Sequence, residues 1–180
     1  LYNVDEVSMT SALVGKLLYR AIYTQNDDFI WPVENPIITS AFGRRRAPET
    51  SQGKGSPNHS GWDIVGAPNI MASAPGTVIK AGWSDTNGWY VVIDHGNRRT
   101  TSYVHLKEKP KVAEGQDVKR GQIIGIMGNT GNSGGIHLHF TYRVKDTPTD
   151  PITILPYNSN TPVKYPVTYD SNKGIYVNKY

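Results

Sequence analysis

The side chains that could do chemistry in this chain are its five histidines and one nearby aspartate. His59 opens the run His-Ser-Gly-Trp-Asp that ends at Asp63, and His137 and His139 flank Leu138. Imidazole nitrogen and carboxylate oxygen are ligands of catalytic zinc, which binds them at about 2.0–2.2 Å and keeps a fourth place for water. The sequence therefore offers a candidate His/Asp/His zinc site.

Two further observations favour a site over unrelated histidines. Side chains alternate along a strand, so His137 and His139 are expected on one face with Leu138 on the other. The glycine between His59 and Asp63 argues against a helix and predicts a turn that runs into a strand. A lone histidine is more often a surface or hydrogen-bonded residue, and His95, in an Asp-His-Gly-Asn run, reads as a turn residue.

Composition excludes several classes of protein. The chain has 180 residues, no cysteine and a net charge of +4, and its mean hydropathy is −0.47. Disulfides, cysteine zinc sites and thiol nucleophiles are excluded, and no apolar run approaches the roughly 18 residues of a membrane span. The arginine clusters at 44–46 and 98–99 read as solvated surface. No basic helix or RNA-binding motif accompanies them, so nucleic acid is not an expected partner.

The spacing of apolar residues predicts one helix followed by a mainly antiparallel β domain. Residues 5–23 repeat apolar side chains at i+4, which indicates a short N-terminal helix. After Trp31 the period becomes two, and turn residues appear at short intervals. The predicted strands are Ile37–Phe42, Thr77–Trp83, Tyr90–Asp94, Thr100–Leu106, Ile123–Met127 and His137–Val144.

The segments between and after these strands divide the chain. Residues 44–58 read as a long loop that forms one wall of a cleft beside His59. Residues 157–180 hold five of the eleven tyrosines and read as one or two edge strands or a docking tail. We therefore expect an N-terminal helix and linker over 1–30, one domain over 31–156, and a tyrosine-rich extension over 157–180.

Between residues 31 and 151 the two histidine patterns are joined by further motifs, among them Ser40–Arg45, Tyr103–Leu106 and Gly115–Gly125. Together these motifs resemble the lysostaphin/LytM-type zinc endopeptidases, which cleave peptide cross-links of bacterial peptidoglycan. The motifs occur in the family's order and without a large gap, so the resemblance is specific. The matching segments are Ser40–Arg45, His59–Asp63, Gly76–Val78, Ala81–Trp83, Ile93–Gly96, Tyr103–Leu106, Gly115–Gly125, Gly128–Gly131 and His137–Phe140.

The resemblance implies a fold, a cofactor and a role for each site residue. The implied fold is an antiparallel sheet like a barrel-sandwich hybrid. His59, Asp63 and His139 match the ligands of one zinc ion, and His105 and His137 match the two catalytic histidines. One neutral imidazole would take the proton of the attacking water, and the other would stabilise the oxyanion or protonate the leaving amine. Which histidine does which is left open.

Two positions depart from the family's pattern. Some relatives carry a tyrosine shortly before the first ligand, and residues 46–58 contain none. The family often has glutamate after His-Leu-His-Phe, where this chain has Thr141. That position is expected at the surface or beside a ligand, so we expect activity to survive the change.

Two other function classes compete with the enzyme. One is an inactive relative that serves as a scaffold or wall-binding module in an envelope or phage-tail assembly; degenerate relatives usually lose a site residue, and this chain keeps all five. The other is a lipoyl- or biotinyl-type carrier, suggested by residues 115–125. This chain lacks the Met-Lys-Met tripeptide whose lysine is commonly modified in such carriers.

The biological setting stays open. An extracellular or envelope location, secreted or periplasmic, or a phage tail would each suit such a domain. The bond that is cut, either a direct cross-link to a diamino acid or a glycine bridge, is also left open.

Overall fold

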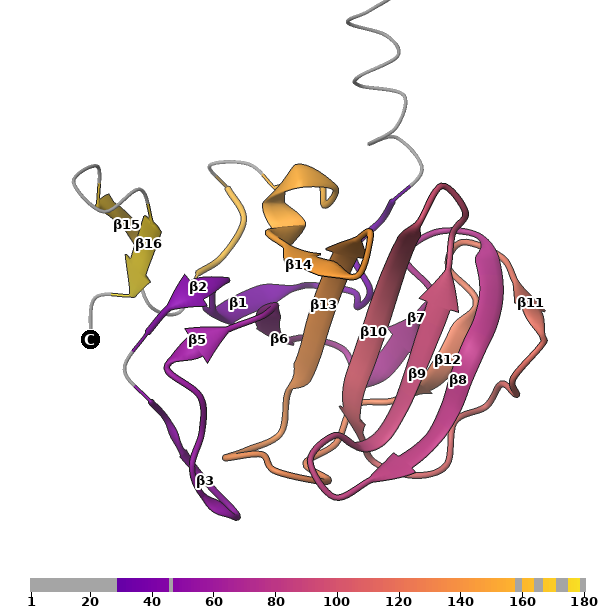
Figure 1. Cartoon of the computed structure of the whole chain (residues 1–180), viewed down its shortest axis with the longest axis horizontal. Coiled ribbons are helices and arrows are strands. Elements are labelled where there is room, and N and C mark those ends of the chain that lie inside the picture. Colours follow the sequence, from indigo (N-terminus) through magenta and orange to yellow (C-terminus); the bar gives the residue numbers. More distant parts are fainter. Residues whose placement is uncertain (1–28, 46, 158–159, 164–166, 171–174, 179–180) are drawn as a thin grey trace, which may run out of the picture.

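The computed structural model describes residues 29–45, 47–157, 160–163, 167–170 and 175–178 (Figure 1). The predicted helix over residues 5–23 lies outside these residues. Over the described residues the chain is mainly antiparallel β, which confirms the predicted fold class, and helical structure is limited to the single turn η1 (Pro151–Thr153). No described helix is long and apolar enough to cross a membrane.

One eight-stranded sheet dominates the domain, and its strands run antiparallel to their neighbours. Strand β14 (Thr147–Thr149) pairs with β13 outside the main order. In spatial order, the other strands are β1 (Ile37–Ser40), β6 (Trp62–Val65), β13 (Leu138–Val144), β10 (Arg99–Leu106), β9 (Gly88–Asp94), β8 (Gly76–Ser84) and β11 (Asp117–Val118).

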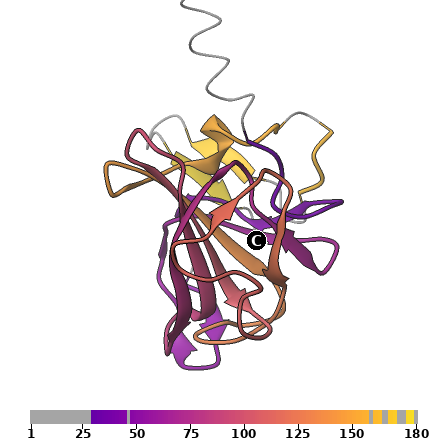
Figure 2. The same ribbon diagram turned by 90° about the vertical axis from the view of Figure 1, so that its right-hand side faces the viewer.

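The predicted strands lie close to the observed ones. The first ends at Ser40 rather than Phe42, and β12 (Ile123–Ile126) forms a separate pair with β7 (Asn69–Met71), behind the main sheet in Figure 1. Figure 2 shows the long strands side by side after a quarter turn. Short turns join β8 to β9 and β9 to β10, and the second contains His95, which the sequence predicts as a turn residue.

The main sheet has a core face and a functional face. Tyr103 in β10 pairs with Phe140 in β13, and both side chains are fully buried in the apolar core. The next pair along the strands, Val104 and His139, points to the opposite face because side chains alternate. The same alternation puts Trp62 in the core and Asp63 on the functional face.

Residues 44–58 are not the unstructured loop that the sequence predicts. The segment leaves β2 (Gly43–Arg44), turns through the hairpin β3 (Glu49–Thr50) and β4 (Gly53–Lys54), and returns as β5 (Asn58–His59). Because β2 and β5 pair, the segment is a long hairpin, here called the arm. Short polar runs with Gly and Pro do not show the alternation from which strands are predicted.

Two strands are described in the tyrosine-rich end, where the sequence predicts one or two edge strands or a docking tail. Strands β15 (Val167–Asp170) and β16 (Ile175–Asn178) pair with each other in a sheet of their own. Among the described residues of this end, Val163 forms a parallel bridge to Ile38 of β1, which links the end to the main sheet.

Gly61 provides a test of how the fold fixes the β5–β6 connection. A Cβ atom at Gly61 would lie 2.2 Å from the carbonyl oxygen of Phe140, whereas one at Gly82 would meet nothing within 4 Å. We expect Gly61→Ala to lower the free energy of unfolding by about 1–3 kcal/mol through overpacking. Gly82→Ala is the control, and it should be neutral or slightly stabilising. Chemical denaturation measures both, and equal effects would show that the close approach is not a constraint.

Candidate metal centre

Two strands and the base of the arm bring three potential metal ligands together. The register of β6 against β13 sets Asp63 directly opposite His139, and His59 lies at the end of β5. Asp63 Oδ1 is 3.0 Å from His59 Nε2 and 2.9 Å from His139 Nδ1, and the two nitrogens are 3.0 Å apart. Ligand atoms of tetrahedral zinc lie about 3.3 Å from one another, so this donor set fits zinc with little adjustment.

Two more histidines face the same group. His137 precedes β13 and puts Nε2 3.4 Å from Asp63 Oδ1, so it shares a face with His139 as strand alternation predicts. The ring of His105, at the end of β10, lies 5.0 Å from the ring of His137 and 6.1 Å from that of His139. The structure thus brings all five predicted site residues into one cluster, while His95 lies elsewhere.

His105 reaches this cluster through an unusual backbone. Strand alternation would put it on the core face with Tyr103, but its φ is +67° and the pairing of β10 with β9 shifts register here. A left-handed conformation at a non-glycine residue costs about 1–3 kcal/mol and is found most often at functional sites. The backbone N–H of His105 donates to the carbonyl of Asn87, which holds the turned segment.

His95 behaves as the sequence suggests. It follows β9 in the turn to β10, with Nδ1 2.7 Å from the carbonyl of Pro75 and Nε2 2.7 Å from the hydroxyl of Thr101. Both ring nitrogens therefore have partners remote from the cluster. Burial lowers the pKa of His95, which keeps it neutral in this structural role.

The five side chains lie in a cleft of about 580 Å³. One wall is the arm, and the other comprises residues 132–136 and the turn between β8 and β9. The arm is tied to this far wall because the N–H of Ser51 donates to the carbonyl of Ser133, and the Gln52 side chain donates to that of Asp85. A Cβ at Gly134 would lie 2.4 Å from the carbonyl of Glu49, so the two walls touch. The arm therefore closes one end of the cleft.

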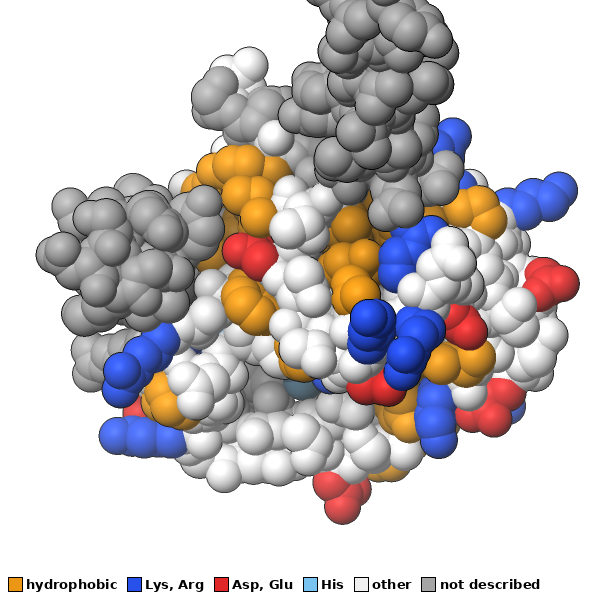
Figure 3. All heavy atoms as spheres, turned by 45° about the horizontal axis from the view of Figure 1, so that its top comes forward, with side chains coloured by type: hydrophobic (Ala, Val, Ile, Leu, Met, Phe, Trp, Pro, Cys, Tyr) orange, Lys and Arg blue, Asp and Glu red, His pale blue; other side chains and the backbone are white. Residues whose placement is uncertain are grey.

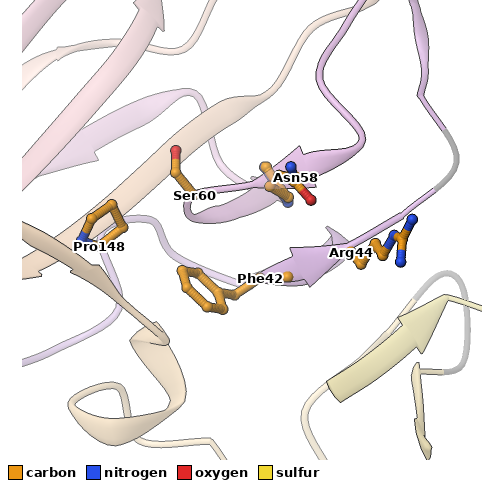
Figure 4. A pocket seen from close by; sticks show the side chains of 7 residues that line it. Phe42, Arg44, Asn58, Ser60 and Pro148 are labelled. Carbon is orange, nitrogen blue, oxygen red and sulfur yellow. The ribbon is translucent and has the colours of Figure 1, made fainter. Parts of the chain in front are cut away.

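A second hollow lies beside the paired strands β2 and β5. Its lining includes Phe42, Arg44, Asn58, Ser60 and Pro148, and Figure 4 shows Arg44 at the end remote from Pro148. His59 lines both hollows, so β5 forms part of the partition between them. On the face shown in Figure 3, basic and acidic side chains are interspersed and do not form one basic surface.

Burial and the neighbouring charges set the protonation of the site. Burial would raise the pKa of Asp63, but the charge of His59 and hydrogen bonds from the histidines hold it well below its ordinary value. Burial, with the nearby charge of His137, lowers the pKa of His105 to about 4, so this ring is neutral at neutral pH. Burial would also lower the pKa of His137, but its hydrogen bond to Asp63 and the charge of that carboxylate raise it.

Each histidine of the cluster has a partner for its second nitrogen. Nδ1 of His59 lies 2.7 Å from the carbonyl oxygen of Ala41. Nδ1 of His105 lies 2.7 Å from the carbonyl oxygen of Thr130, and Nδ1 of His137 lies 2.8 Å from that of Gly135. His139 faces the cluster through Nδ1 instead, and its Nε2 lies 3.1 Å from the hydroxyl of Thr141. Thr141 is buried, so of the two places expected for it, the structure puts it beside a candidate ligand.

Arg45 corrects the reading of residues 44–46 as solvated surface. Its Nη1 donates to Asp63 Oδ2 at 2.6 Å, and only 12% of either side chain is exposed. Sequence reasoning included Arg45 in a motif but gave it no role. The sequence feature that could have indicated a role for Arg45 is its place in the same short motif as Ser40. In the structure the two residues are in contact, because the same Nη1 also donates to the Ser40 hydroxyl at 2.7 Å.

Comparisons with known proteins agree with this geometry. A peptidoglycan DD-endopeptidase of Vibrio cholerae, ShyC, is 37% identical over 146 residues, which are 78% of this chain and 33% of ShyC. The glycyl-glycine endopeptidase ALE-1 of Staphylococcus capitis is 34% identical over 135 residues, 68% of this chain and 35% of ALE-1. The chain spans about a third of the length of these relatives.

A solved structure and a family pattern complete the comparison. The crystal structure of a zinc-containing peptidase from Vibrio cholerae matches with a TM-score of 0.58 and 34% identity, over 68% of this chain and 39% of that one. The pattern of peptidase family M23 matches residues 57–151, which include the four histidines and the aspartate of the cluster. The chain belongs to peptidase family M23.

Proposed function

We propose that this chain is a zinc-dependent endopeptidase that hydrolyses peptide cross-links of bacterial peptidoglycan. The observation that carries the proposal is the convergence of His59, Asp63 and His139 within one cleft that also holds His105 and His137. Three imidazole or carboxylate ligands with acid–base groups beside them are the parts that a hydrolytic zinc site needs. The described residues contain no His-Glu-x-x-His helix, so a glutamate base of that kind is not part of the proposal.

The three proposed ligands would hold the ion through one atom each, namely His59 Nε2, Asp63 Oδ1 and His139 Nδ1. When bound, zinc supplies Lewis-acid chemistry, because it polarises a carbonyl group and makes water a stronger acid. A donor set of two imidazoles and one carboxylate suits this ion better than Mg²⁺ or Ca²⁺, which favour oxygen ligands.

The surrounding backbone fixes which nitrogen of each ring faces the cleft. A carbonyl oxygen can only accept, so Nδ1 of His59, His105 and His137 must carry the hydrogen that Ala41, Thr130 and Gly135 accept. Their Nε2 atoms are then free of hydrogen in the neutral ring. In His139 the neighbour of Nε2 is the hydroxyl of Thr141, which can accept as well as donate, so a ring with Nε2–H donating to Thr141 would leave Nδ1 free of hydrogen. With the four rings neutral and in these tautomers, the chain would present four unprotonated nitrogens to the cleft.

His105 and His137 are the proposed acid–base pair. His105 is neutral at neutral pH, so its Nε2 could accept a proton from the attacking water. His137 has a raised pKa and could donate to the developing oxyanion or to the leaving amine. The geometry supports two roles for the two rings because they lie side by side, with centroids 5.0 Å apart, along one edge of the ligand cluster.

The substrate class follows from the relatives. One is named as a DD-endopeptidase of peptidoglycan and another as a glycyl-glycine endopeptidase, so the family's bond preference differs among members with similar domains. We propose that the arm contributes to that preference in this chain, because it forms a wall of the cleft and closes one end. Such a substrate implies action in the cell envelope or outside the cell, whether as a secreted enzyme or in a larger envelope or phage-tail assembly.

The first prediction concerns hydrolysis. Wild-type protein with zinc should release new amino termini from purified peptidoglycan sacculi, and a chelator should abolish the release. His105→Ala and His137→Ala should each lower kcat/KM by about 10²–10⁴-fold, the contribution of a positioned acid or base. Mass spectrometry of the fragments identifies the bond that is cut.

His95→Ala is the matched control, since it removes a histidine whose partners lie outside the cleft. Release of termini by the two cleft variants at the wild-type rate would contradict their assigned roles. Zinc bound in equal amount to the protein, with no release from sacculi of several cross-link types, would indicate a scaffold or wall-binding module.

The second prediction concerns Thr141. Thr141→Val keeps the side-chain volume but leaves the Nε2–H of His139 buried without an acceptor. Loss of such an outer partner should weaken zinc binding about 10–100-fold, because the ring is no longer held with Nδ1 toward the ion. Competition with a chromophoric chelator measures the dissociation constant. The same substitution at Thr100 in β10 is the control, and equal affinities in all three proteins would refute the role of Thr141.

A further inference from the structure

Arg45 lies outside the five proposed site residues but is in direct contact with one of them. It follows β2 at the base of the arm, where its backbone N–H donates to the carbonyl of Pro57. This bond pairs the two sides of the arm and fixes the direction in which the Arg45 side chain leaves the backbone. The guanidinium then reaches Asp63 and Ser40 through the single atom Nη1, at 2.6 and 2.7 Å.

The carboxylate of Asp63 divides its two oxygens between different neighbours. Oδ1 faces the histidines, at 3.0 Å from His59 Nε2, 2.9 Å from His139 Nδ1 and 3.4 Å from His137 Nε2. Oδ2 accepts the short hydrogen bond from Arg45. A charge-assisted bond of this length in a site of low exposure restricts rotation of the carboxylate about its Cβ–Cγ bond. Only one oxygen therefore remains directed at the ligand cluster.

We propose that Arg45 is a positioning residue that keeps Asp63 a one-oxygen ligand and so preserves an open coordination place on the bound zinc ion. A carboxylate can bind a metal through one oxygen or through both, and a catalytic zinc site must leave a place free for exogenous ligands. With Oδ2 held by Arg45, the two-oxygen mode is blocked. The inference rests on the zinc site that we propose above.

Because Arg45 is positively charged, two possible roles predict different changes in zinc affinity when it is removed: blocking two-oxygen binding, and simply stabilising the site. A guanidinium repels a nearby cation, so its removal should by itself favour zinc binding. If Arg45 served only to support a metal ligand, its removal would weaken zinc binding. If it blocks two-oxygen binding, its removal should leave the affinity unchanged or tighter while the ion becomes more fully coordinated and catalysis falls.

The test compares the full 180-residue chain with three variants, after substitution of Co²⁺ for zinc. Four-coordinate Co²⁺ absorbs visible light much more strongly than five- or six-coordinate Co²⁺, so the spectrum reports the coordination number. We expect Arg45→Met to lose visible absorption and to lower kcat with zinc about tenfold or more, with no rise in the dissociation constant for zinc. Arg45→Lys, which keeps the charge and a donor, should recover part of both signals.

Arg44→Met is the matched control, because Arg44 is exposed and lines the second hollow rather than the cleft (Figure 4). Circular dichroism checks that each variant is folded, and Arg45→Gln replaces Arg45→Met if the latter is not. An unchanged Co²⁺ spectrum in the folded Arg45 variant, or a weaker zinc affinity in that variant, would overturn the proposal. Failure of the wild type to bind either metal would instead overturn the zinc site itself.

Discussion

The site depends on the crowding of donor atoms around one oxygen. Asp63 Oδ1 has three imidazole nitrogens within 3.4 Å, and two of these nitrogens lie only 3.0 Å from each other. In neutral rings with these tautomers the nitrogen atoms present lone pairs to one another and to an anion, so the group repels itself unless a cation or protons lie between its members. Arg45 partly neutralises the negative charge at Oδ2 of Asp63, but it does not relieve the repulsion among the atoms around Oδ1.

The fold holds these crowded donor atoms together through the register of paired strands rather than through flexible loops. The pairing of β6 with β13 puts Asp63 opposite His139, and a one-residue slip would send one of them to the core face. Gly61 lets the β5–β6 connection approach the backbone of β13, which brings His59 alongside. Side chains held by a sheet register are positioned more precisely than side chains on loops, which suits a rigid site whose opposite face is a packed core.

The sequence predicts the strands, and it predicts that His137 and His139 share one face, because both features depend on local alternation of side chains. It could place His105 only through the family resemblance, since alternation alone would put that ring in the core and the positive φ that reverses it leaves no mark in residue type. Arg45 reads as surface charge because its partner Asp63 is eighteen residues away and the pairing needs the arm to fold back. The hairpin within the arm is missed for the same reason, as its strands are only two residues long.

Residues 46–58 contain no tyrosine, so in the proposed mechanism stabilisation of the oxyanion would fall to His105 or His137. Asp63 raises the pKa of His137 through a hydrogen bond and its charge, and a bound cation would neutralise that charge. That neutralisation would lower the pKa of His137 again, so the pKa alone would not assign the donor and the acceptor. The assignment falls to position: His137 touches the ligand carboxylate, whereas His105 is held one ring farther out by the carbonyl of Thr130. In the proposed mechanism the ring nearer the ion would meet the oxyanion once its Nε2 carries a proton, because its Nδ1–H already donates to Gly135, and the outer ring would take the proton from water.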